Sequence, residues 1–312
     1  FLGLTCWAAC AERSPRPHLP ATAPAPLTTA NLAPASVLTP IAPIELHLKP
    51  YIGTLKTVSV QAGTATLPFV LDTGGGLTII TPRVAKTLGC EPFGRLTGFR
   101  SSGERLDMQR CGPAPLHIGP LTVTREVASF DLMSLIGSFA PEVGGLITLD
   151  TLRDYAITLD LAHDLLVIES DASLAARVRG MSPMQARIAS QAGGASLDLF
   201  VAVKARQGPL WLELDSGNSG PVLLAPHALA QLGLTPDVSN APGSPAAPGA
   251  PDSKVPAQRT VSLDFLGLGP VEVTAREAPL IYDGLLNAET IGKMVLTLDL
   301  RTGRLWGSLP TR

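Results

Sequence analysis

An internal repeat constrains the fold of this chain more than any other feature of its sequence. Phe69-Val70-Leu71-Asp72-Thr73-Gly74 in the first half is matched by Leu212-Glu213-Leu214-Asp215-Ser216-Gly217 in the second. Farther along, Thr158-Leu159-Asp160-Leu161 recurs unchanged as Thr297-Leu298-Asp299-Leu300, at nearly the same distance from each aspartate. Three more landmarks recur in the same order between these, at 84–89 and 228–233, 119–126 and 269–277, and 145–147 and 284–286. Such self-similarity indicates the duplication of a structural unit.

The local pattern inside each unit is that of β-structure. Apolar or alternating runs of about four to eight residues are separated by Gly, Pro and Asp. Hairpins are predicted over 158–168 and 297–306, turning at Ala162-His163-Asp164 and at Arg301-Thr302-Gly303. One short helix is expected after each Asp-containing loop. We therefore predict an all-β chain of two similar lobes with short helices, related by a pseudo-two-fold axis.

Two compositionally biased stretches divide the 312 residues into parts. Residues 14–43 are rich in Pro, Ala and Thr, which predicts an extended spacer. Residues 240–256 are rich in Pro, Gly, Ala and Ser, which predicts a loop inserted in the second half. A helical connector is expected over 171–191 from its Ala, Arg, Met and Gln. The predicted parts are a signal-like segment 1–13, the spacer 14–43, a first lobe 44–170, a connector 171–194 and a second lobe 195–312.

The first 13 residues resemble a processing segment. Phe1–Cys10 is apolar and ends in small residues, as the tail of a secretory signal peptide does. Ala8-Ala9-Cys10 also resembles a bacterial lipobox, in which Cys10 would carry a lipid, although Trp7 stands where Leu is usual. A buried N-terminal strand is the alternative. We therefore expect an exported protein, periplasmic or lipid-anchored in a bacterial envelope, whose only membrane attachment is that anchor.

Composition argues against several classes of function. Hydrophobic residues make up 45% of the chain and charged residues 16%, which is typical of a folded globular protein. The formal net charge of −2 and the lack of a Lys/Arg run argue against nucleic acid as a partner. The histidines and cysteines show no metal-binding spacing, so no metal is expected. Cys90 and Cys111 would form a disulfide in an exported protein or remain as two thiols.

The two Asp-(Thr/Ser)-Gly tripeptides carry the candidate chemistry. Each follows an apolar strand, so that Asp72 and Asp215 would stand at the mouth of a sheet, with Gly74 and Gly217 permitting the turns that present them. One such tripeptide is a common turn sequence, but two at the same point of a repeat would meet on the pseudo-two-fold axis. This pair, each with a later Gly-hydrophobic-hydrophobic element, resembles the pepsin and retropepsin group of aspartic peptidases over roughly 44–309.

The resemblance implies two acid-protease-type lobes in one chain and an endopeptidase that acts on polypeptides without a cofactor. Two carboxyls about 3 Å apart cannot both ionise readily, so they share a proton. The ionised one would deprotonate a bridging water, and the protonated one would donate to the scissile carbonyl oxygen. The hydroxyls of Thr73 and Ser216 would bond across the axis and brace the loops. A monomer would then suffice for the site.

Two features depart from the family pattern. Many relatives have Ser or Thr directly after Asp-Thr-Gly, where it bonds the carboxylate, but here Gly75-Gly76 and Asn218-Ser219 follow. The later element usually ends in a Gly that packs behind the catalytic loop, and here Thr148 and Asn287 take that place. A side chain at these two positions is expected to shift the loops, which puts efficient proteolysis in doubt.

A hairpin flap over the cleft is the other element that the resemblance implies. Arg95–Asp107 is the first-half candidate, with its tip at Ser101-Ser102-Gly103 and with Phe99 and Ser101 as substrate contacts. An extended peptide would pair its backbone beneath such a flap. An ordinary surface hairpin is the alternative. The matching second-half segment is the Pro/Gly/Ala-rich loop, which lacks the alternation of a hairpin arm, so a single flap is expected.

Two other functions compete with the aspartic endopeptidase. Gly217-Asn218-Ser219-Gly220-Pro221 resembles the serine loop of trypsin-like peptidases, but neither His117 nor His163 stands in the sequence context that such an enzyme needs. The second competitor is a peptide-binding module of the same fold with a weakened or silent site. Thr148 and Asn287 favour it, whereas the presence of both aspartates argues against it. The sequence favours the endopeptidase.

Overall fold

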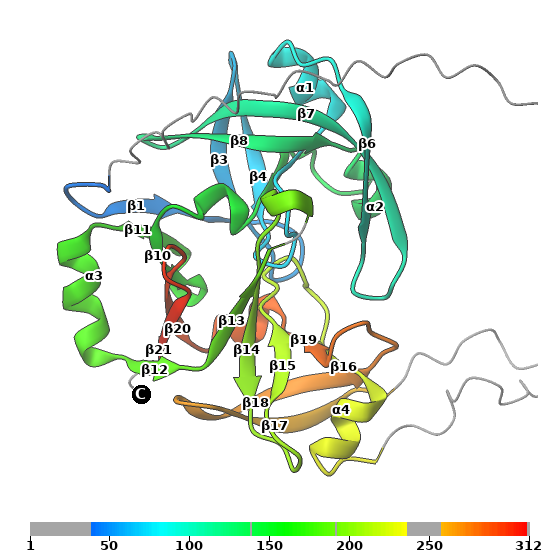
Figure 1. Ribbon diagram of the computed structural model, residues 1–312, viewed down its shortest axis with the longest axis vertical. Helices are drawn as coiled ribbons and strands as arrows, with labels where there is room; N and C mark the ends of the chain where they lie inside the picture. Colours follow the sequence, from blue (N-terminus) through cyan, green and yellow to red (C-terminus); the bar gives the residue numbers. More distant parts are fainter. Residues whose placement is uncertain (1–38, 138, 191, 236–256, 311–312) are drawn as a thin grey trace, which may run out of the picture. The chain divides into compact units, whose positions relative to one another are not determined.

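The computed structural model describes residues 39–137, 139–190, 192–235 and 257–310 (Figure 1). Two units are distinguished along the chain, Phe1–Val37 and Leu38–Arg312, and all described residues belong to the second. The signal-like segment, most of the spacer and the inserted loop lie outside the described residues. Within the described ranges no helix is long and apolar enough to cross a membrane.

The first lobe is an eight-stranded sheet that closes into a barrel. Its order is β2-β3-β4-β9-β5-β8-β7-β6, and a further pairing of β3 with β7 closes a ring of six strands. On β3, buried Val58, Val60 and Ala62 alternate with exposed residues, which is the period of a half-buried strand. The lobe comprises β2 (Lys49–Pro50), β3 (Lys56–Ala62), β4 (Ala65–Leu71), β5 (Ile79–Ile80), α1 (Pro82–Thr87), β6 (Phe93–Phe99), β7 (Arg105–Ile118), β8 (Leu121–Ser129), α2 (Met133–Ile136), β9 (Gly145–Ile147) and η1 (Asp150–Leu152).

The second lobe repeats this plan. Its sheet has the order β13-β14-β15-β19-β16-β18-β17, and a pairing of β14 with β17 again closes six strands. The parallel pairs β4–β9 and β5–β8 of the first lobe have counterparts in β15–β19 and β16–β18. The lobe comprises η4 (Ala192–Gly194), β13 (Ala186–Ala189), β14 (Asp198–Val203), β15 (Leu210–Glu213), β16 (Val222–Leu224), α4 (Pro226–Gln231), β17 (Arg259–Phe265), β18 (Gly269–Glu277), β19 (Gly284–Leu285) and α5 (Ala288–Ile291). The prediction of two similar β lobes is confirmed.

The helices after the two loops also repeat. α1 and α4 each begin with a proline, Pro82 or Pro226. Proline is favourable at this position because the N–H that it lacks would have no hydrogen-bond partner within the helix. Each is followed by a glycine with positive φ, Gly89 at 66° and Gly233 at 78°, a conformation that ends a helix and that residues with a Cβ rarely adopt. The one short helix predicted in each unit is therefore present.

A six-stranded sheet joins the lobes on the repeat axis. Its order is β1-β11-β10-β20-β21-β12, so that β10 of the first half pairs directly with β20 of the second. Thr158 lies opposite Thr297, and their hydroxyl oxygens are 2.8 Å apart. Because equivalent residues face each other, the pseudo-two-fold axis passes between them. The strands are β1 (Ile44–His47), β10 (Ala156–Asp160), β11 (Leu165–Glu169), β12 (Ser182–Met184), β20 (Val295–Asp299) and β21 (Arg304–Ser308).

The two predicted hairpins form the centre of this sheet. β10 turns into β11 through η2 (Leu161–His163) and Asp164, and β20 turns into β21 through residues 300–303. Both turns end in a residue with positive φ, Asp164 at 56° and Gly303 at 71°. The predicted turn positions are thus confirmed.

The connector is helical only in its first part. α3 (Asp171–Arg177) opens with a capping box of Ser170 and Ser173, and η3 (Val178–Gly180) ends it. The chain then becomes extended in β12 and β13, so the prediction of a helix to residue 191 is wrong. Pro183 accounts for the change, because it lacks the N–H that a helix interior needs and is tolerated on an edge strand.

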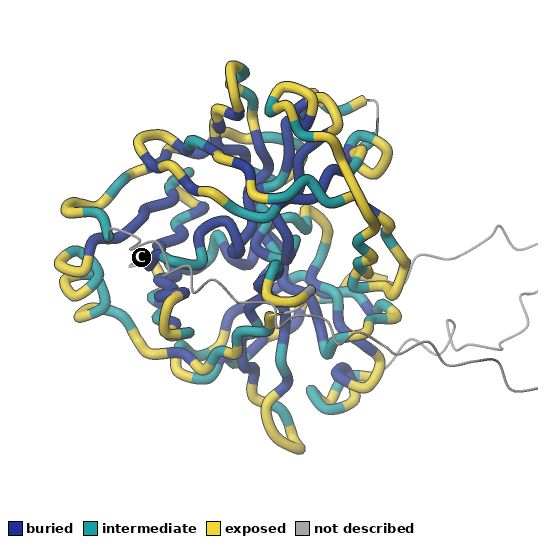
Figure 2. Tube along the Cα trace, turned by 45° about the horizontal axis from the view of Figure 1, so that its top comes forward, coloured by how far each residue is buried: buried dark blue, intermediate teal, exposed yellow. Residues whose placement is uncertain are grey.

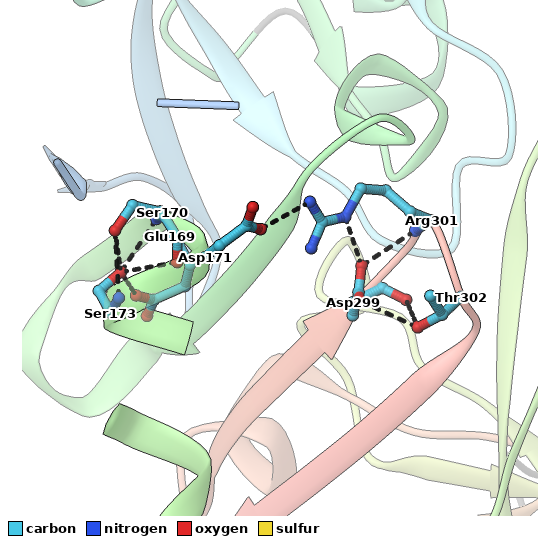
Figure 3. A network of polar contacts seen from close by, with 7 residues as sticks. All are labelled: Glu169, Ser170, Asp171, Ser173, Asp299, Arg301 and Thr302. Carbon is cyan, nitrogen blue, oxygen red and sulfur yellow. Dashed lines mark hydrogen bonds and ion pairs between the residues drawn. The ribbon is translucent and has the colours of Figure 1, made fainter. Parts of the chain in front are cut away.

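A polar network fixes this connector to the central sheet (Figure 3). The buried carboxylate of Glu169 accepts hydrogen bonds from Thr158 at 2.6 Å, from Ser173 and from Arg177. Arg301 lies between Asp171 of α3 and Asp299 of β20 and pairs with both, as Figure 3 shows. The start of α3 is therefore held to hairpins from both halves.

Buried residues, dark blue in Figure 2, run through the interior of the described part of the chain. The main cluster of buried side chains includes residues from both barrels and from the central sheet, such as Phe69, Leu159 and Phe265. A second cluster, around Val70, Met108 and Leu132, belongs to the first lobe alone. The lobes consequently share one core, and a lobe without its partner would expose part of it.

Cys90 and Cys111 form a disulfide, with their Cα atoms 5.8 Å apart. Cys90 follows α1, and Cys111 stands where the register of β7 shifts between Arg110 and Gly112. The bridge therefore ties the base of the β6–β7 hairpin to the body of the lobe, and of the two alternatives left by the sequence the disulfide is the one that the structure contains.

Replacing both cysteines by alanine is expected to lower the free energy of unfolding by roughly 3 kcal/mol, because the bridge closes a loop of 21 residues. Urea unfolding of the wild-type and Cys90→Ala/Cys111→Ala proteins measures the difference. Adding a reductant should weaken the wild-type protein and leave the double variant unchanged; equal stability of the two oxidised proteins would contradict the prediction.

Candidate active site

Each repeat aspartate begins a tight turn at the end of a parallel strand pair. Asp72 follows β4, and its N–H donates to the carbonyl of Ile147 on β9 at 2.9 Å. In the second lobe the N–H of Leu286 donates to the carbonyl of Glu213 at 2.9 Å. β4 and β15 each pair with a strand on both sides, which fixes where the chain leaves the sheet. Gly74 and Gly217 then lie in the turns that follow.

Two hydroxyls bond the loops to each other across the axis. Thr73 Oγ1 donates to the carbonyl of Leu214 at 2.6 Å and accepts from the N–H of Ser216 at 3.0 Å. Ser216 Oγ donates to the carbonyl of Leu71 at 2.7 Å and accepts from the N–H of Thr73 at 3.0 Å. Both side chains are buried, so all four bonds lie away from water. The sequence-based expectation for Thr73 and Ser216 matches this geometry.

The two carboxyls meet between these loops. Asp72 Oδ1 accepts from the N–H of Gly74 at 3.1 Å, and Asp215 Oδ1 accepts from the N–H of Gly217 at 2.7 Å. The side chains of Asp72 and Asp215 are also hydrogen-bonded to each other. A Cβ at Gly74 would stand 2.7 Å from Asp215 Cγ, and one at Gly217 would stand 2.5 Å from Asp72 Cγ. Only glycine allows the backbone this close to the opposite carboxyl.

Burial dominates the electrostatics of the pair. Removal from water raises the pKa of Asp72. The pKa of Asp215 is raised well above its usual range, first by burial and then by the charges of Asp72 and Glu213. The pair consequently retains a proton to higher pH than two exposed aspartates would, and this proton belongs to both carboxyls.

Two further buried acids lie beside the dyad, and sequence reasoning missed them as part of the site. Burial, with the charges of Asp198 and Asp72, raises the pKa of Glu213 to about 9. Burial, with the charges of Asp72 and Asp150, raises the pKa of Asp198 to about 6. Glu213 lies opposite Phe200, two residues from Asp198 on the same face of β14. The available signal was a lone acid in an apolar strand, Leu212-Glu213-Leu214.

Thr148 and Asn287 each pack beside the loop of their own lobe. Thr148 Cγ2 would be 3.0 Å from a Cβ at Gly75, so the glycine in the first loop makes room for the threonine. Asn287 caps α5, accepting from the N–H of Thr290 at 2.9 Å, and its amide donates to the carbonyl of Gly220 at 2.6 Å. The cross-axis bonds between the loops are present beside both side chains, and the expected shift relative to the family pattern stays a prediction.

The residues that follow the tripeptides do not bond the carboxylates through side-chain hydroxyls. Gly75 has no side chain, and the amide of Asn218 donates to the carbonyl of Pro221 at 3.1 Å. Ser219 is exposed, and among the described residues none of the hydrogen bonds joins it to a histidine. The serine-nucleophile alternative thus lacks its base in the described part of the chain.

The predicted flap is a hairpin whose tip contacts the other lobe. β6 and β7 pair from Phe99↔Arg105, next to the tip, to Phe93↔Arg110 at the base. The N–H of Gly103 donates to the carbonyl of Arg100 at 2.8 Å across the tip. The carbonyl of Ser101 accepts from the N–H of Ile281, in the segment between β18 and β19, at 3.0 Å. Phe99 is 62% exposed. The hairpin therefore spans from the first lobe to the second.

No group of three or more His, Cys, Asp or Glu side chains in the described ranges has the arrangement of a metal site.

The comparisons bear on the fold. Neither a protein-family model nor a curated protein matches the sequence. The crystal structure of basic 7S globulin from soybean is similar, with a TM-score of 0.51 and 10% sequence identity, over 87% of this chain and 96% of that chain. With its two closed, pseudo-symmetric barrels, the chain fits the acid-protease-like fold. That relative is named as a globulin and not as a peptidase, so the likeness shows the fold alone.

Replacing Thr73 by alanine is expected to lower the free energy of unfolding by on the order of 3 kcal/mol, because it leaves the carbonyl of Leu214 and the N–H of Ser216 buried without a partner. Thr73→Ser keeps the hydroxyl and should lose much less. Urea unfolding of both variants tests this; equal losses would assign the role to the methyl group instead.

The folded protein is expected to lose stability as pH rises from about 4.5 to about 9. Over this range the native state keeps a proton on Glu213 that the unfolded chain releases, because the pKa of Glu213 is raised from 4.5 to about 9. Glu213→Gln removes this titration. The variant should match the wild type near pH 4 and be the more stable of the two near pH 8, as measured by urea unfolding at each pH.

The exposed Glu45 offers a matched control for this test. Glu45→Gln makes the same change of charge on the surface of β1, and its stability should follow the wild-type pH dependence. A Glu213→Gln protein whose stability falls with pH as steeply as the wild type would contradict the assignment.

Proposed function

We propose that this protein is an aspartic endopeptidase whose catalytic pair is Asp72 and Asp215. The observation that carries the proposal is the mutual contact of two half-buried carboxyls, each held by the glycine N–H of its own loop. Two carboxyls in this arrangement share one proton, which supplies a general base and a general acid at the same place.

The proposed reaction uses these two groups in turn. The ionised carboxyl takes a proton from water as the water oxygen bonds to the peptide carbonyl carbon, and the other carboxyl donates its proton to the carbonyl oxygen. Proton transfer back to the amide nitrogen then lets the C–N bond break. The buried hydroxyls of Thr73 and Ser216 keep the two loops in register throughout, so that the distance between the carboxyls does not relax.

The substrate in this proposal is an extended polypeptide under the β6–β7 hairpin, with Phe99 and Ser101 as contacts. Support comes from the hairpin itself, whose tip reaches Ile281 of the second lobe, and from the exposed ring of Phe99. An extended chain beneath a hairpin pairs its backbone as an added strand would.

Export to the periplasm, with lipid anchoring at Cys10, is likewise proposed. The disulfide between Cys90 and Cys111 supports an oxidising compartment, because such bridges are rare in reducing cytosol. The signal-like segment itself lies outside the described residues.

A peptide-binding module with a silent dyad is the second candidate. It is favoured by the absence of a hydroxyl donor at Gly75 and by the Asn218 amide, which donates to a loop carbonyl and not to Asp215. The same site beneath the β6–β7 hairpin would then hold a polypeptide without cleaving it.

Substitution of either aspartate by asparagine is expected to abolish cleavage of an unfolded protein substrate, because each change removes the shared proton and keeps the side-chain volume. Activity would be followed from acidic to neutral pH with the chain from Ile44 onward, with circular dichroism to verify folding. Ser219→Ala is the matched control and should retain most activity, since its hydroxyl is exposed and outside the dyad.

The remaining outcomes separate the candidates. Loss confined to Ser219→Ala would point to a serine enzyme. No cleavage by the unsubstituted protein at any pH, together with retained binding of the substrate, would replace the endopeptidase by the binding module.

A further inference from the structure

A groove away from the dyad lies where the connector passes between the sheets. It encloses about 670 Å³ and is lined by residues 183–187 of the connector, by residues 303–306 and by Trp211. This volume falls within the range of about 300–1,000 Å³ that is usual for ligand sites. None of its lining residues belongs to the two aspartate loops, so the groove is a separate surface feature.

Two tryptophans and two arginines give the groove its chemistry. The guanidinium carbon of Arg187 lies 3.7 Å from the centre of the Trp211 ring, a cation–π contact that keeps this arginine at the groove. Arg304 and Trp306 stand two residues apart on β21 and therefore share one face of that strand. Buried Met184 and Leu305 supply the apolar lining.

The two arginines at this groove have no ion-pair partner in the described ranges, since Asp299, which stands opposite Arg304 on β20, pairs with Arg301. Arg187 and Arg304 are exposed, and in the described ranges neither forms an ion pair with a carboxylate. Arg177 and Arg301, in contrast, are both paired with buried or partly buried acids. A planar guanidinium suits bidentate binding of a carboxylate, so two of them at one groove favour an acidic occupant.

The backbone at the groove favours an extended occupant. β12 is the last strand of the six-stranded sheet and β13 the first of the seven-stranded sheet, so both are edge strands. The lining segment 183–187 joins them and contains residues of each. Gln185, between the two strands, is already paired, because its N–H donates to the carbonyl of Leu266 at 3.1 Å and its carbonyl accepts from the N–H of Ala202 at 3.0 Å. The edge that an added strand can pair with is therefore that of β13.

We infer that this groove binds an acidic, extended segment of a partner polypeptide. Its carboxylates pair with Arg187 and Arg304, and an aromatic side chain packs against Trp211 and Trp306. The site is independent of the dyad, so it serves an active peptidase and a silent binding module alike.

A fluorescein-labelled Glu-Glu-Phe-Glu-Glu peptide is the probe, and fluorescence polarisation at pH 7 with the full chain is the readout. The acidic peptide should bind, and Gln-Gln-Phe-Gln-Gln and Lys-Lys-Phe-Lys-Lys should bind at least tenfold more weakly. Affinity for the acidic probe should fall as salt is raised, because exposed charge pairs are screened. The double variant Arg187→Gln/Arg304→Gln should bind the acidic peptide at least tenfold more weakly than the wild type.

A variant of equal net charge controls for long-range attraction. Arg83→Gln/Lys86→Gln removes two exposed positive charges of α1 and should keep wild-type affinity for the probe. The inference is overturned if no acidic peptide binds, if the glutamine peptide binds equally well, or if both double variants lose affinity to the same extent. Because the assay needs no cleavage, its failure and the failure of the proposed peptidase activity are distinguishable.

Discussion

The four hydrogen bonds made by Thr73 and Ser216 are the constraint on which the rest of the structure depends. They join two loops that lie far apart in sequence, and each bond is buried. Breaking the set would leave backbone groups of both lobes without partners in a water-free environment. The same bonds hold the two carboxyls together, although their partial desolvation and mutual repulsion oppose it. In the joining sheet, Thr158 and Thr297 also form a buried hydroxyl contact between equivalent residues on the axis.

The backbone of the two lobes is pseudo-symmetric, but the side chains that flank the two aspartates differ. The residue two positions before the first aspartate is Val70, which packs in an apolar cluster with Met108 and Leu132. Its counterpart is Glu213, whose pKa is raised to about 9 and which lies near Asp198. The dyad therefore has apolar side chains on the Val70 side and two buried acids with raised pKa values, Glu213 and Asp198, on the other. The free energy of unfolding is therefore expected to be higher at acidic than at neutral pH, because a buried carboxyl destabilises the folded state least when it is protonated.

The sequence repeat predicted the backbone features that occur in both lobes. The features found in one lobe only depend on individual contacts between residues far apart in sequence. The loops at Asp72 and Asp215 and the two central hairpins were predictable, because their turn residues and apolar runs stand in local sequence. The acidity around Glu213 was not, since it depends on the register of β14 against β15, which brings Asp198 to the same face. The extended part of the connector could have been predicted from Pro183. The contact of Ser101 with Ile281 joins residues that no sequence pattern relates.

The side chains behind the two loops differ from the pattern that the sequence resembles. In that pattern, the later element usually ends in a glycine that packs behind the catalytic loop. Here Thr148 takes that place, and Gly75 stands in the loop beside it. Thr148 occupies space that a side chain at position 75 would need, and the cross-axis bonds between the loops are present. In the second lobe Asn287 takes the place of the glycine, and its side chain is both a helix cap and a tether to Gly220. Thr148 and Asn287 thus both pack against the loop of their own lobe, Thr148 beside Gly75 and Asn287 through its bond to Gly220.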